Sequence, residues 1–73
     1  MHAEIATHAD QVRNIYRIVV VVDGKLAADT GRVIPSMVVR ERNRLNAEWS
    51  NRADSVHAGS IPRLFTLTNS LGV

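Results

Sequence analysis

The histidines and their neighbours are the side chains of this chain that are best suited to chemistry. His2, His8 and His57 are the only histidines, and the chain has no cysteine. His2 and Glu4 form an H-x-E triplet, which zinc deaminases combine with a later P-C-x-x-C, and this chain has no cysteine to complete that set. No histidine and carboxylate have a spacing typical of a closed metal site. We therefore predict no metal-binding residues.

A second group, Asp54, Ser55 and His57, contains the residue types of a serine hydrolase triad. Triad members normally come from separate elements, and the chain lacks a G-x-S-x-G elbow, so we interpret this group as a polar loop. The glycines form neither a G-x-G-x-x-G nor a P-loop spacing. No acidic pair stands out as a general acid and base. We predict that the chain is not an enzyme, has no catalytic residues and uses no cofactor.

Arginines on a predicted helix are the best candidate binding site, because arginine suits bidentate contacts with phosphate or carboxylate. Arg40 and Arg44 share the exposed face of that helix. Arg42 points near the apolar stripe, where it either extends past the stripe's edge to solvent or pairs with an acidic group. The alternative for this face is a solvated surface with ion pairs to Glu41 and Glu48. The predicted partner-binding residues are Arg40, Arg42, Arg44 and Asn51.

Two stretches that would position these residues have helical periodicity. Residues 3–16 carry apolar side chains three and four positions apart, and Thr7 with Asp10 could form a capping box, which predicts a shorter N-terminal helix. Ser36 is a favourable N-cap for a long helix near residues 36–54, whose apolar side chains fall on one side.

The remaining elements are strands. A hairpin is predicted at residues 17–34, because residues 18–22 are all β-branched and Asp23-Gly24 is typical of a type I′ turn. The segment Asp29-Thr30-Gly31 indicates a bulge or a second turn in the returning strand. A C-terminal strand is predicted at residues 61–68.

The sequence thus predicts an α+β fold, with a small antiparallel sheet packed against the long helix and the shorter one. We expect a single domain over residues 1–73 with a frayed tail at residues 69–73. Residues 18–22 are apolar on both sides of the strand, so both faces of the sheet should be covered, the second by the N-terminal helix or by another copy of the chain. No signal peptide or membrane-length apolar run is visible, and we expect a cytoplasmic protein.

One stretch resembles a known family. Residues 29–35, which read Asp-Thr-Gly-Arg-Val-Ile-Pro, and the following Val39 and Arg40 resemble the core of the swapped-hairpin transition-state regulators. The resemblance implies an interleaved dimer that binds DNA. The helix predicted here is longer than the family's and lacks its Leu-Gly end, so the chain is not assigned to that family.

The chain also resembles a class rather than a sequence: the small inhibitor proteins of phages and plasmids, such as anti-CRISPR proteins, are similarly short and motif-free. We therefore expect a non-enzymatic interaction protein, an inhibitor or adaptor that binds a larger protein or protein complex. The alternative is a small dimeric nucleic-acid-binding protein that uses the helix arginines, although the net charge of +2 is mild. A homodimer is compatible with both the protein-binding and the nucleic-acid-binding function, and no membrane partner is expected.

Overall fold

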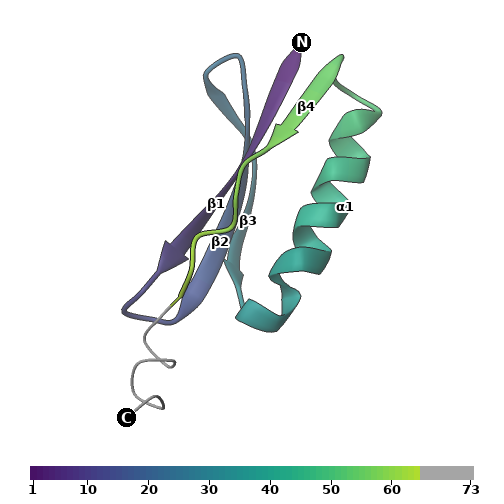
Figure 1. Cartoon of the computed structure of the whole chain (residues 1–73). Coiled ribbons are helices and arrows are strands. Elements are labelled where there is room, and N and C mark those ends of the chain that lie inside the picture. Colours follow the sequence, from purple (N-terminus) through teal and green to yellow (C-terminus); the bar gives the residue numbers. More distant parts are fainter. Residues whose placement is uncertain (65–73) are drawn as a thin grey trace.

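The computed structural model describes residues 1–64 and has an α+β fold, as predicted (Figure 1). Four strands form one sheet: β1 (His2–Asp10), β2 (Ile15–Val22), β3 (Lys25–Val33) and β4 (Ser55–Ala58). A short 3-10 turn, η1 (Pro35–Met37), leads into the helix α1 (Val38–Ser50). Within residues 1–64, no helix has the length and apolar character needed to cross a membrane.

The sheet is mixed, with the strand order β3-β2-β1-β4. The first three strands form an antiparallel meander, and α1 then carries the chain across the sheet to β4, which pairs in parallel with β1. The prediction of a purely antiparallel sheet is therefore wrong for its last strand. That strand also lies earlier than the predicted residues 61–68: residues 59–64 contain no strand, and residues 65–68 lie outside the described part.

The predicted N-terminal helix over residues 3–16 is wrong, because this stretch forms β1 and the start of β2. The side chains buried in β1 are Ala3, Ile5 and Thr7, which alternate with a period of two rather than at helical spacing. Since β1 is paired on both edges, its backbone hydrogen bonds are satisfied by β2 and β4. Tertiary pairing has overridden the local helical pattern.

The predicted capping box is absent for the same reason. Thr7 is buried in the sheet, and Asp10 closes the turn between β1 and β2. The Oδ1 atom of Asp10 accepts hydrogen bonds from the backbone N–H groups of Val12 and Arg13, each at 3.1 Å. Short acidic side chains often close turns in this way.

The predicted hairpin is confirmed in β2 and β3. Asp23 and Gly24 both have positive φ, 51° and 79°, as a type I′ turn requires. The predicted bulge is also present, since the pairing register shifts between Arg17 and Val19 of β2, opposite Asp29 to Gly31 of β3. Gly31 has a φ of 71°, a conformation that is easy only for glycine.

The long helix is confirmed but is shorter than predicted. The α-helix occupies Val38–Ser50, whereas Ser36 lies in the preceding 3-10 turn and makes no capping hydrogen bond. Pro35 begins that turn, where the missing N–H of proline costs nothing. Residues 51–54 form the turn that leads into β4.

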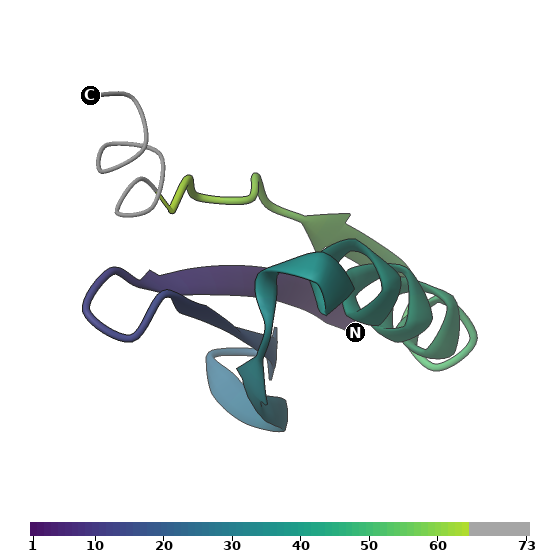
Figure 2. The same cartoon turned by 90° about the horizontal axis from the view of Figure 1, so that it is seen from below.

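The core lies between α1 and one face of the sheet. Ile18 and Val20 of β2 are fully buried, and Leu45 and Trp49 cover them from α1. The segment of residues 59–64 lies on the same side of the sheet as α1 (Figure 2), where the Tyr16 hydroxyl donates to the carbonyl of Pro62 at 2.8 Å. The opposite face has no described element over it. The expectation that both faces of β2 are covered therefore holds on one side only among residues 1–64.

Candidate functional site

The face of β1, β2 and β3 that points away from α1 is here called the open face. Strand pairing places Val19 opposite Ala6 and Val21 opposite Leu26, so their side chains share this face. These four residues form the aliphatic patch. Val19 and Val21 are half-buried by their neighbours in the sheet, whereas Leu26 is 62% exposed. Aliphatic side chains in such a position are available to a second molecule.

A row of basic side chains crosses the open face at one end of the aliphatic patch. His8 of β1 pairs with Arg17 of β2, which in turn pairs with Arg32 of β3. Together with Arg13 from the β1–β2 turn, these residues line a hollow of about 310 Å³, here called the arginine hollow. Like charges directly opposite one another in a sheet are destabilising, so this row needs negative charge nearby.

Asp29 supplies part of that negative charge. The Arg17 guanidinium donates from Nε to both carboxylate oxygens of Asp29, at 2.9 and 3.1 Å, and also from Nη2. The backbone N–H of Gly31 donates to the same carboxylate at 2.8 Å. The hydrogen bond from Arg17 and then that from Gly31 lower the pKa of Asp29 from 3.8 to about 2. The bulge in β3 thus holds Asp29 as an ionised partner for Arg17.

This pairing predicts a pH-dependent stability for the Asp29→Asn variant. Because the folded-state pKa of Asp29 is depressed, the carboxylate stabilises the fold above pH 3.8, and this contribution is lost as the pH falls towards 2. The free energy of unfolding of the variant should therefore be lower than that of the wild type at pH 6, and the two should become equal as the pH falls towards 2. Urea unfolding at several pH values between these limits measures the difference. Arg17→Gln should make the stability depend less on pH over the same range. A stability difference between Asp29→Asn and the wild type that stays constant with pH would contradict the ion pair between Asp29 and Arg17.

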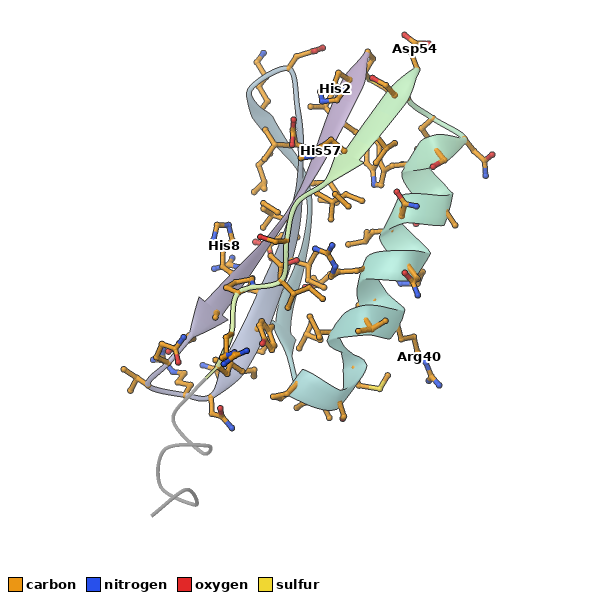
Figure 3. The ribbon with its side chains drawn as sticks, in the orientation of Figure 1. His2, His8, Arg40, Asp54 and His57 are labelled. Carbon is orange, nitrogen blue, oxygen red and sulfur yellow. The ribbon has the colours of Figure 1, made fainter. Side chains whose placement is uncertain are left out.

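A second polar cluster lies near the other end of the sheet and unites two sequence groups. Parallel pairing puts His2 opposite Ser55 and Glu4 opposite His57. His2 Nε2 lies 3.0 Å from Glu4 Oε1, His57 Nδ1 lies 3.0 Å from Glu4 Oε2, and His2 Nδ1 lies 2.6 Å from the Ser55 hydroxyl. Figure 3 shows His2 and His57 at this end of β1 and β4. The hydrogen bonds from His2, then from His57, lower the pKa of Glu4.

The chemistry available to this cluster is limited by solvent. The side chains of His2 and Glu4 are each 50% exposed and that of His57 is 66% exposed, so water competes for every contact. Asp54, the third member of the predicted loop group, instead pairs with the N-terminal amino group. Among residues 1–64, no group of histidine and carboxylate side chains suits a metal ion. The cluster joins β4 to β1 and shows no reactive geometry.

On the face of α1 that was predicted to bind a partner, one arginine side chain is unpaired among the described residues and another is neutralised by ion pairs. The Arg40 side chain points away from the sheet (Figure 3) and makes no hydrogen bond or ion pair with the rest of residues 1–64. Arg44 pairs with Glu41 at 2.8 Å and with Glu48 at 3.5 Å. These contacts correspond to the ion pairs that the sequence offered as the alternative for this face. The Asn51 side chain donates to the carbonyl of Ala47 at 3.3 Å, at the end of the helix.

Arg42 takes neither of the two orientations that its sequence position suggested. Its guanidinium turns inward, where Nη1 donates to the Thr7 hydroxyl and Nη2 donates to the Gly59 carbonyl, both at 2.6 Å. The side chain is half-buried. It thereby links α1 to β1 and to the segment that follows β4. This placement gives Arg42 a role in holding the fold together.

Sequence reasoning missed the open face and its basic row. Arg17 and Arg32 lie far apart along the chain, and only the register of the β2–β3 hairpin with its bulge sets them side by side. Counting outwards from the Asp23-Gly24 turn would pair Arg17 with Thr30, and two register shifts move its partner to Arg32. No family model, curated protein or solved structure matches this chain.

Proposed function

We propose that this chain is a non-enzymatic interaction protein that binds a larger protein through the open face of its sheet. The observation that carries the proposal is the aliphatic patch: Val19, Val21 and Leu26 have no cover among residues 1–64, and charged side chains border them. An apolar centre inside a polar rim is the usual composition of a protein interface. The basic row favours an acidic surface on the partner.

The open face favours a protein over a nucleic acid as the partner. Sheets that bind single-stranded nucleic acid present aromatic side chains on which bases stack. Here Tyr16 and Trp49 are both buried on the helix side of the sheet, and the patch itself is aliphatic. An inhibitor or adaptor of phage or plasmid type, acting in the cytoplasm, fits a protein that works by covering a surface on a larger complex.

Nucleic-acid binding is the second candidate, and the arginine hollow is the observation that favours it. A salt titration with duplex DNA separates the two functions, because phosphate contacts make log Kd rise with log salt by about 0.9 per contact. A steep slope would assign the chain to the second candidate. Absence of DNA binding at low salt would leave the protein partner as the function.

The aliphatic patch supplies the direct test. A partner isolated from the native host should bind the Leu26→Glu variant about tenfold or more weakly than the wild type, since a buried aliphatic anchor is worth at least ~1.4 kcal/mol. Val39→Glu is the matched control, because Val39 is exposed to a similar degree, 57% against 62%, but lies on α1. Binding should be measured by calorimetry with both purified components.

Two further outcomes are informative. If Arg40→Glu and Arg44→Glu weaken binding while Leu26→Glu does not, the contact lies on α1, as the sequence alone predicted, and the open face is rejected. If light scattering shows that the isolated wild type is a dimer and Leu26→Glu makes it monomeric, the occupant of the open face is a second copy of the chain. Either result would overturn the proposal that the open face receives a different protein.

A further inference from the structure

We propose that the arginine hollow is a binding site for a phosphate group. The site goes beyond the proposed function, because it needs no macromolecular partner and it can fail while the aliphatic patch still binds one. Three arginines, Arg13, Arg17 and Arg32, line the hollow from the β1–β2 turn, β2 and β3, and His8 lines it from β1. Four basic residues from three strands and one turn of the meander thus border one volume.

The carboxylates in and around the hollow do not neutralise these charges. Asp10, which also lines the hollow, receives one hydrogen bond from Arg13 Nη1 at 2.9 Å, and Asp29 is occupied by Arg17. The Arg32 side chain makes no hydrogen bond or ion pair with any other of the first 64 residues. Two carboxylates therefore face three guanidinium groups, and an excess positive charge remains before His8 is counted.

Donors also remain for a ligand. Arg17 uses Nε and Nη2 for Asp29, and its Nη1 is unpaired within the described chain. Arg13 uses only one side-chain nitrogen, and Arg32 uses none. The planar fork of arginine matches the oxygens of phosphate, and several forks around one anion hold it better than one. The hydrogen bonds to Asp29 and Asp10 fix two of the forks in place before a ligand arrives.

The size of the hollow suits a phosphate that carries a small substituent. Its volume of about 310 Å³ lies at the lower end of the range for small-molecule sites. Ile15, whose side chain lies on the open face, adds apolar surface to the lining. A dianionic phosphate matches the excess charge better than a single carboxylate does, because it satisfies Arg32 and still offers oxygens to Arg17.

The test is a titration of the full chain with inorganic phosphate at constant ionic strength, which is set with chloride. The chemical shifts of the backbone amides in NMR spectra report binding. We expect saturable shifts around His8, Arg17 and Arg32, with a Kd on the order of 1 mM. Arg32→Gln should weaken binding about tenfold or more. Arg40→Gln is the matched control, since Arg40 is also exposed and unpaired among the described residues but lies on α1, and its affinity should equal that of the wild type.

A titration with phenyl phosphate distinguishes a free phosphate ion from a phosphate group carried on a larger ligand. Tighter binding of this ester than of inorganic phosphate supports a phosphate carried on a larger ligand, and equal or weaker binding supports a free anion; both outcomes support the site. Shifts that chloride alone reproduces, or equal phosphate affinity in Arg32→Gln and the wild type, would overturn it. Unfolding midpoints of both variants show that each is folded when the titration is read.

Discussion

Replacing Arg42 with methionine should lower the free energy of unfolding by about 2–4 kcal/mol, because a hydrogen bond from a charged group is worth roughly 1.5–3 kcal/mol and this residue makes two. The Thr7 hydroxyl lies within a buried residue, and the Gly59 carbonyl follows β4. Methionine keeps an unbranched apolar stem but has no group that can donate to either oxygen. The loss should be measured by urea unfolding at neutral pH.

Two comparisons make this prediction specific. Arg40→Met makes the same chemical change on the exposed side of α1, where no contact with residues 1–64 is lost, and should change stability by less than about 0.5 kcal/mol. Arg42→Lys retains the charge but has a single nitrogen in place of the two that donate here, and we expect an intermediate loss. If Arg42→Met were as stable as Arg40→Met, Arg42 would be free for the partner contact predicted from the sequence.

The hairpin and the helix could be predicted because their signals are local. Asp23-Gly24 fixes a turn by backbone conformation alone, and the β-branched residues before it disfavour a helix. The pairing of the strand that follows is predictable only up to the first of its two register shifts, between Val20 and Val21 of β2. The number of residues in a bulge decides which side chains of β3 lie beside those of β2 on the same face of the sheet, and the sequence pattern does not give that number.

The first strand and the candidate site could not be predicted, because both depend on pairing between distant segments. Residues 2–10 form a strand that pairs on one edge with β2 and on the other with β4, which lies beyond α1 in the chain. The same pairing brings His2 and Glu4 to Ser55 and His57, two groups that looked unrelated in the sequence. The sequence places Arg42 near the apolar stripe of the predicted helix, but its partners Thr7 and Gly59 follow only from the order of the strands.

The second large effect lies in β2, where neighbouring valines face opposite ways. Val20 is fully buried under α1, whereas Val21 lies on the open face and is only half-buried. Removing two buried methyl groups costs their transfer energy plus the cavity left behind, so Val20→Ala should lower the free energy of unfolding by about 2–3 kcal/mol. The same substitution at Val21 should cost less than about 1 kcal/mol, because water and neighbouring side chains can close the gap.

This pair of variants decides whether the open face is open in the isolated protein. The substitution is identical at the two positions, so the strand propensity lost is the same and the difference reports burial alone. A second copy of the chain on the open face would bury Val21 as well, raise the cost of Val21→Ala to that of Val20→Ala, and make stability rise with protein concentration. Urea unfolding at two protein concentrations, about 50-fold apart, should instead give the same unequal losses at both, because Val21 on an uncovered face is already partly in contact with water.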